Sequence, residues 1–152
     1  MSTPGWIEQD TDTPPPATTP PDVTFVVGPG TPPSGTGSAQ FSVGEDGNNA
    51  AQLRNPNFAG TKLSDLTALG YSTYVTQDGS GGQAVYIILQ VDTDGDAGIE
   101  DLLFFEPVYQ SSTFFPSNPQ GTLTTGTWQS WNALAGGWYS VFGTPARDLA
   151  RT

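Results

Sequence analysis

The segment 84–110, AVYIILQVDTDGDAGIEDLLFFEPVYQ, constrains the fold of this chain more than any other stretch. It contains two apolar runs of strand length, rich in Val, Ile, Tyr and Phe, with five carboxylates and two glycines between them. Such runs are typical of buried β-strands, and glycine lets the backbone between them turn sharply. The segment therefore predicts a β-hairpin at the centre of the fold, closed by an acidic loop.

Short apolar runs separated by turn residues recur along the rest of the chain. With 152 residues, 19 Gly, 14 Pro and only 12% charged residues, the composition favours one all-β domain. We predict an antiparallel, jelly-roll-like β-sandwich over residues 23–143 and a C-terminal tail over 144–152. Strands are expected at 23–27, 38–43, 71–77, 122–131 and 138–142, besides the two of the hairpin.

Less regular elements are predicted between these strands. Leu63, Leu66 and Leu69 recur every three residues, which suits one short helical turn within 61–70, ended by Gly70. Turns are expected at 45–49 and 78–82, and a frayed helical turn at 147–151. Phe58 is expected to fill an irregular crossover.

Residues 1–22 form a Pro/Thr-rich N-terminal segment. Proline fixes an extended backbone and removes amide donors, so we expect an extended arm rather than a core element. Trp6 and Ile7 are the apolar pair that would anchor this arm, in a groove of the same domain or of a neighbouring subunit.

Five motifs in order resemble a family of extracellular bacterial β-sandwich domains of secreted and surface proteins, mostly without assigned function. These motifs are VGPGTPPSGTGS at 27–38, GTKLSDLTALGYSTYV at 60–75, LQVDTDGD at 89–96, FFEPVYQ at 104–110 and GTWQSWNALAGGWYS at 126–140. Members of that family often continue with further strands after the Trp-rich segment. The resemblance implies a sandwich that another subunit could complete by strand addition.

This leads to two alternatives for the assembly state. In the first, the chain is a homo-oligomeric or polymeric subunit of an extracellular filament or surface layer, with the arm docked on its neighbour. In the second, it is a monomer with the arm folded back on itself. We expect an extracellular or cell-surface location, although residues 1–9 lack the features of a secretion signal.

Charge and residue content exclude several classes of function. The formal net charge of −11 repels nucleic acid and anionic surfaces. No apolar run is long enough to span a bilayer, so we expect no membrane insertion. The chain has no cysteine and no histidine, which removes disulfides, thiol nucleophiles, imidazole bases and the usual zinc sites.

The acidic loop predicts a metal site formed by Asp92, Asp94, Asp96, Glu100 and Asp101. Hard oxygen ligands at this spacing suit Ca²⁺, which takes about 6–8 oxygens and offsets the repulsion between carboxylates. The match to an EF-hand is partial, because the sixth position is not glycine, the twelfth is Leu103, and the flanks are strands. A solvated Asp/Gly turn is the alternative. A weaker candidate is the group Glu45, Asp46 and Asn48.

Aromatic residues near the end of the domain indicate a rival function, a carbohydrate-binding module. An exposed aromatic platform could stack on sugar rings, although Trp and Tyr more often pack in a core. Trp128 and Trp131 differ by three positions and therefore point to opposite faces of a regular strand. The candidate stacking residues are Trp128, Trp131, Trp138 and Tyr139.

Catalysis is the least favoured class, and we expect no enzyme. A glycosidase-like pair could be built from Glu106 with Glu100 or Asp101. Glu106, however, immediately precedes Pro107 at the end of an apolar strand, where a carboxylate can simply face solvent.

Overall fold

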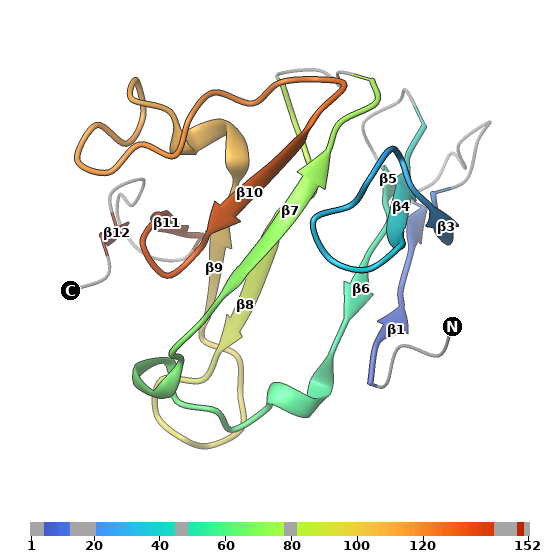
Figure 1. Cartoon of the computed structure of the whole chain (residues 1–152). Helices are drawn as coiled ribbons and strands as arrows, with labels where there is room; N and C mark the ends of the chain where they lie inside the picture. Colours follow the sequence, from blue (N-terminus) through green and yellow to red (C-terminus); the bar gives the residue numbers. More distant parts are fainter. Residues whose placement is uncertain (1–4, 13–20, 45–48, 78–81, 142–148, 151–152) are drawn as a thin grey trace. The chain divides into compact units, whose positions relative to one another are not determined.

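A computed structural model describes residues 5–12, 21–44, 49–77, 82–141 and 149–150 (Figure 1). In this described part, regular structure consists of β-strands and short 3-10 turns, without an α-helix. The strands pair in antiparallel fashion, and one isolated parallel bridge joins Val75 to Thr125. The all-β class predicted from the composition is therefore confirmed.

The chain divides into two compact units, Met1–Asp65 (unit 1) and Leu66–Thr152 (unit 2). This boundary lies inside the single domain predicted for residues 23–143. The residues predicted as an arm belong to the same unit as the first two long strands.

The described residues of unit 1 form three separate two-stranded sheets. The longest is the hairpin of β3 and β4, and the other two pair β1 with β6 and β2 with β5. Two 3-10 turns follow β6. The elements are β1 Ile7–Glu8, β2 Thr11–Asp12, β3 Asp22–Val27, β4 Gly37–Ser42, β5 Asn49–Ala50, β6 Leu53–Arg54, η1 Pro56–Phe58 and η2 Leu63–Asp65.

The β3–β4 hairpin forms where unit 1 is richest in β-branched residues, as predicted. Val23 lies opposite Phe41 and is buried. Along the same strand, however, Phe25 is 50% exposed and Val27 is 85% exposed. Val43, the last residue of the predicted strand 38–43, lies beyond the end of β4 and is exposed. The hairpin therefore buries only one end of its apolar stripe.

The residues predicted as an arm pair with their own chain. Ile7 lies opposite Arg54 in the β1–β6 sheet, and the Arg54 guanidinium donates to the side-chain oxygen of Gln9 at 2.6 Å. The Glu8 carboxylate accepts the backbone N–H of Val23 at 3.1 Å. Both predicted anchors, Trp6 and Ile7, are exposed in this arrangement. Backbone pairing, rather than insertion of these two side chains, holds residues 7–12.

Unit 2 contains a four-stranded sheet in the order β12-β11-β9-β8 and a two-stranded sheet of β7 and β10 (Figure 1). The 3-10 turn η3 follows β9 directly. The elements are β7 Gly70–Tyr74, β8 Ile87–Val91, β9 Asp101–Phe105, η3 Pro107–Gln110, β10 Trp128–Asn132, β11 Gly137–Ser140 and β12 Leu149–Ala150.

Side chains from both sheets of unit 2 meet in one hydrophobic core. Phe105 from β9, Trp131 from β10 and Trp138 from β11 are buried in it with Ala133. Partly buried apolar side chains pack around this cluster: Leu69, Tyr71, Ile87, Leu89, Leu103 and Leu123. Alternation along β9 and β8 supplies Leu103, Phe105, Ile87 and Leu89 to the same side, as expected for strands with one buried face.

Polar groups inside this core are hydrogen-bonded, as burial requires. The Trp131 indole N–H donates to the Thr73 hydroxyl at 2.8 Å, and the Trp138 indole N–H donates to the Ala133 carbonyl at 2.7 Å. Gln110, which is 0% exposed, donates to the carbonyl of Gly137 at 3.0 Å and accepts its N–H at 2.9 Å. Gln110 therefore joins η3 to the start of β11.

One predicted strand and one predicted helical turn differ from the structure in extent. The predicted strand 122–131 is regular only from Trp128, because the Gln129 side chain bonds to the Thr124 N–H and the Thr122 carbonyl and satisfies them in place of a neighbouring strand. The helical turn predicted within 61–70 spans only η2, and Gly70 begins β7 instead of ending a helix.

Other local predictions are wrong or lie outside the described residues. Phe58 is exposed in η1 and fills no crossover. Leu149 and Ala150 pair with β11, so the predicted helical turn is a strand at these two positions. Residues 45–48 and 78–81, where turns were expected, lie outside the described residues, as does the weaker acidic group of Glu45, Asp46 and Asn48.

Candidate metal centre in the loop between β8 and β9

Strands β8 and β9 form the hairpin predicted for segment 84–110. The register places Ile87 opposite Phe105 and Val91 opposite Asp101. The Glu100 N–H donates to the Val91 carbonyl at 3.0 Å and closes the loop of residues 92–100. The acidic loop is thus held at both ends by a strand that contributes to the core.

Asp92 organises the backbone of this loop. One carboxylate oxygen accepts the N–H groups of Asp94 at 3.1 Å and Gly95 at 2.6 Å, and the other accepts the Ala97 N–H at 2.9 Å. Short carboxylate side chains stabilise turns in this way, by accepting hydrogen bonds from backbone groups two or three residues ahead. Asp92 is therefore both a candidate ligand and the residue that shapes the loop.

The other acidic side chains also contact the loop backbone. Asp94 accepts the Asp96 N–H at 3.1 Å. The Glu100 carboxylate accepts the Thr93 N–H at 2.8 Å from across the loop. This last contact draws Glu100, at the end of the loop, toward the first turn of the same loop.

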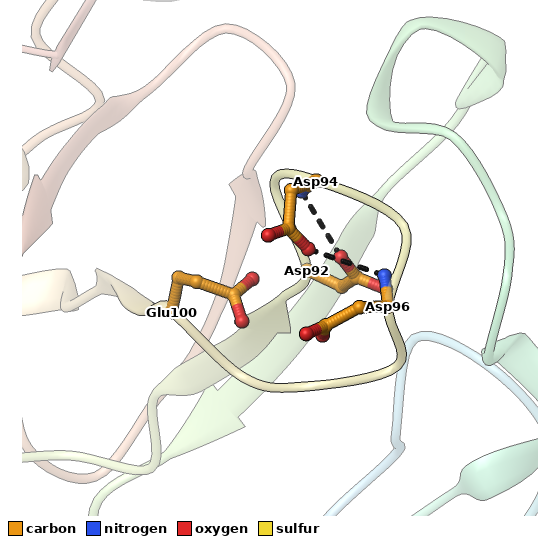
Figure 2. A group of neighbouring side chains, drawn as sticks. All are labelled: Asp92, Asp94, Asp96 and Glu100. Atoms are coloured by element: carbon orange, nitrogen blue, oxygen red, sulfur yellow. Dashed lines mark hydrogen bonds between the residues drawn. The ribbon is translucent and has the colours of Figure 1, made fainter.

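These contacts bring four carboxylates together. Asp92, Asp94, Asp96 and Glu100 each offer an oxygen within 4.8 Å of those of the others, and all four side chains are exposed. Figure 2 shows the carboxylates turned toward a common space inside the loop. Four negative charges this close repel one another, and a divalent cation between them would offset that repulsion.

Asp101, the fifth predicted ligand, is not part of this group. It lies in β9, where its carboxylate accepts the Ser140 hydroxyl at 2.7 Å and its own neighbour's N–H, that of Leu102, at 2.8 Å. Asp101 thus joins β9 to β11. Sequence spacing alone does not distinguish this role, because Asp101 follows Glu100 directly.

Hydrogen bonding favours the charged form of Asp92. The pKa of its carboxyl lies below the ordinary value, chiefly because the Gly95 N–H donates to it. The N–H groups of Ala97, Asp94 and Asp96 act in the same direction, and a desolvation contribution acts against them. Asp92 is therefore ionised, as a metal ligand must be.

The loop follows the spacing of an EF-hand over its first nine positions. Asp92, Asp94 and Asp96 occupy positions one, three and five, and Glu100 occupies position nine. At the sixth position, where EF-hands have glycine for a sharp turn, Ala97 has a φ of +69°. The backbone turns at that point although the residue is not glycine. This conformation of Ala97 is the feature that the sequence pattern did not indicate.

The predicted aromatic platform is divided between core and surface. Trp131 and Trp138 are buried in the core of unit 2, where their rings cannot stack on a sugar at the surface. Trp128 is half-buried and packs edge-on against Tyr74 at a centroid distance of 5.5 Å. Tyr139 is half-buried and stacks on Phe104 at 5.2 Å. The carbohydrate-binding alternative is left with Trp128 and Tyr139, which lie on different sheets.

The residues of the predicted carboxylate pair for glycoside hydrolysis lie at opposite ends of β9. Asp101 begins β9 and Glu106 immediately follows it, five residues later. An extended chain covers about 16 Å over that span, whereas the two carboxylates of a glycosidase lie roughly 5–10 Å apart. Glu100 is one residue farther from Glu106. This geometry opposes a glycosidase built from these residues.

Comparisons of the chain with protein-family models, with curated proteins and with solved structures find no match. No helix in the described ranges is long and apolar enough to cross a membrane. The function must therefore be inferred from the geometry of the chain itself.

Proposed function

We propose that this chain is a non-catalytic extracellular structural subunit stabilised by Ca²⁺ bound in the β8–β9 loop. The observation that carries the calcium site is the convergence of Asp92, Asp94, Asp96 and Glu100 within 4.8 Å at the end of a core hairpin. A carbonyl oxygen at position seven, that of Gly98, and water would complete the coordination. An ion here would hold both ends of the hairpin together.

Calcium fits this ligand set better than other common ions do. The ligands are exposed carboxylates on an irregular loop, and Ca²⁺ accepts such flexible oxygen geometry. Mg²⁺ demands nearly ideal octahedral coordination. Transition metals favour imidazole and thiolate ligands, and the chain contains neither histidine nor cysteine.

Thermal unfolding with and without Ca²⁺ tests the site. At a free Ca²⁺ concentration 100 times the dissociation constant, the free energy of unfolding should rise by about 2.7 kcal/mol. Asp94→Asn and Asp96→Asn should abolish most of this rise. Asp10→Asn, which removes an exposed charge in unit 1, is the matched control. No rise with Ca²⁺, or equal rises in all variants, would contradict the calcium proposal.

The assembly part of the proposal rests on unit 1. Most of its large apolar side chains are exposed, and its sheets have two strands each. A two-stranded hairpin is marginally stable alone, and exposed apolar patches with free strand edges favour association. We propose that a neighbouring copy covers this unit, and that β1 and β2 can pair with β6 and β5 of the neighbour instead of their own.

Deletion of residues 1–22 tests this assembly. The full chain should form a homo-oligomer or polymer, and the deletion should shift the particle mass measured by light scattering toward the monomer. Trp6→Ser combined with Ile7→Ser is a milder variant that keeps the backbone pairing. Circular dichroism of both variants checks that the β structure remains. A full-length chain that is monomeric at all concentrations, or an unchanged mass after deletion, would contradict the proposal.

We also propose that the β-structure is arranged as a jelly-roll-like sandwich. A jelly-roll-like sandwich is supported by the two sheets of unit 2, whose side chains share one core.

A further inference from the structure

Glu106 lies outside the metal loop, on the face of the four-stranded sheet opposite the core. Phe105 points into the core, so its neighbours Phe104 and Glu106 belong to the other face. The Glu106 side chain is half-buried, and its Oε1 atom accepts a hydrogen bond from the Tyr139 hydroxyl of β11. This is its only side-chain partner in the described part of the chain.

The Tyr139 ring that donates to this carboxylate belongs to a cluster of aromatic rings. Tyr86 stacks on Phe104 at 5.9 Å with an interplanar angle of 28°, and Phe104 stacks on Tyr139 at 5.2 Å with an angle of 15°. Tyr109, one turn after Glu106 in η3, meets Tyr139 edge-on at 5.9 Å and 79°. Tyr86 is 41% exposed, so the group opens to solvent at that ring.

The phenols near Glu106 are neutral hydrogen-bond donors. The pKa of Tyr86 is raised by burial and then by the negative charge of Glu106. Burial, the hydrogen bond to Glu106 and its charge raise the pKa of Tyr139 as well. None of these groups can neutralise the carboxylate.

No basic side chain neutralises the Glu106 carboxylate within the described residues of unit 2. The basic residues of this unit, Arg147 and Arg151, lie outside the described ranges. The described part of the unit carries six acids: Asp92, Asp94, Asp96, Glu100, Asp101 and Glu106. A cation beside a half-buried carboxylate would stabilise its charged form.

We propose that Glu106, together with the rings of Tyr86, Tyr109 and Tyr139, binds an organic cation of the alkylammonium class. Such a group could come from a small quaternary amine or from the lysine side chain of a partner. The carboxylate supplies the opposite charge, and the exposed Tyr86 ring, which stacks on Phe104 through one face, attracts the alkylated ammonium through its other face.

The test is a titration followed by the backbone amide resonances of residues 86, 106, 109 and 139, in saturating Ca²⁺ and at constant ionic strength. The probes are choline, N-acetyl-lysine methylamide and the neutral choline isostere 3,3-dimethylbutan-1-ol. Either cation should give saturable shifts, and the one that binds more tightly distinguishes the two sources. The neutral isostere should give none.

Variants connect the shifts to the site. Glu106→Gln should weaken binding at least about tenfold, because the charge attraction is lost while the side-chain shape is kept. Tyr139→Phe keeps the ring and should weaken binding less. Tyr86→Ala removes the exposed ring without touching the Glu106–Tyr139 bond, and it provides a test if Glu106→Gln does not fold. Asp10→Asn, which removes an exposed charge in unit 1, should leave binding unchanged.

Three results would overturn the proposal. The first is equal binding of the neutral isostere, and the second is full binding by Glu106→Gln or Tyr86→Ala. The third is saturable binding of glucose or N-acetylglucosamine at these resonances without binding of either cation, which would make the site a saccharide site.

Discussion

The two units use strand pairing in different ways. In unit 2, two sheets contribute side chains to one core, and the buried apolar residues include Phe105, Trp131 and Trp138. In unit 1, three sheets pair their backbones, but Val23 is the only large apolar side chain that is buried among the described residues. The exposed ones there are Trp6, Ile7, Phe25, Val27, Val43 and Phe58. Backbone pairing thus occurs with and without a core in the same chain.

The two units should therefore respond differently to substitution. Burial of apolar surface is the main source of stability, and regions with few buried contacts open most readily. Unit 2 should therefore determine the measured stability of the isolated chain, and unit 1 should depend on pairing and on a partner.

The largest expected effect comes from the core of unit 2. Phe105→Ala should lower the free energy of unfolding by about 3–5 kcal/mol, because Phe105 is fully buried. The matched change Phe25→Ala in unit 1 should cost about 1 kcal/mol or less, since half of that ring is exposed. Urea denaturation followed by Trp fluorescence measures both. Equal losses would remove the contrast between the units.

The next largest expected loss of stability comes from a buried polar side chain, that of Gln110. Gln110→Leu would leave the N–H and carbonyl of Gly137 without their partner, at a cost of about 1–3 kcal/mol per unsatisfied group. Gln40→Leu, on the exposed side of β4, is the control and should change stability by about 0.5 kcal/mol or less. If the two variants had the same melting temperature, the hydrogen bonds of Gln110 would add nothing to the stability of unit 2.

The loop offers a substitution that should stabilise. Ala97 has a left-handed φ of +69°, which costs a residue with a Cβ atom about 1–2 kcal/mol. Ala97→Gly should therefore stabilise the loop by about 1 kcal/mol and tighten Ca²⁺ binding a few-fold. Ala59→Gly, at a φ of −56° in unit 1, should only destabilise. Calorimetric Ca²⁺ titration and thermal melts distinguish these outcomes, and a weaker Ca²⁺ affinity in Ala97→Gly would count against the proposed loop geometry.

The smallest effect concerns pH. The folded pKa of Asp92 lies below its ordinary value of 3.8, so its contribution is fully present above that value. As pH falls through the lower folded pKa, the carboxylate takes up a proton and the contribution disappears. In Ca²⁺-free buffer, the stability difference between the native chain and Asp92→Asn should therefore shrink below pH 3.8. A difference that stays constant from neutral pH to the acid range would show that the hydrogen bonds to Asp92 do not favour its charged form.

The β8–β9 hairpin of unit 2 could be predicted because its two strands and its turn lie within one short segment of the sequence. Ile87, Leu89, Leu103 and Phe105 alternate toward one face, and the intervening Asp and Gly residues mark the turn. The proximity of Asp92, Asp94, Asp96 and Glu100 follows from the same short segment. Spacing alone places Asp101 with the loop carboxylates, but β9 begins at this residue and its partner Ser140 is 39 residues away.

Unit 1 could be predicted only in its hairpin. β1 and β6 have two residues each and are separated by more than 40 residues, so neither has a periodicity that a local pattern could show. The local sequence also could not predict which side chains are buried. The alternation of Phe25 and Val27 is the same whether or not a second layer of structure covers them. Which face of a strand is covered depends on elements that lie far away in the sequence.

Strand β9 connects the metal loop, the core of unit 2 and the Glu106 carboxylate. Glu100 precedes it, Phe105 ends it in the core, and Glu106 follows it among the tyrosines. A slip of one residue against β8 would exchange the two faces of the strand, expose Phe105 and turn Glu106 inward. A cation held between Glu100 and Asp92 would oppose that slip. Calcium in the loop would then act as a register lock whose effect reaches Glu106, about 20 Å along the strand.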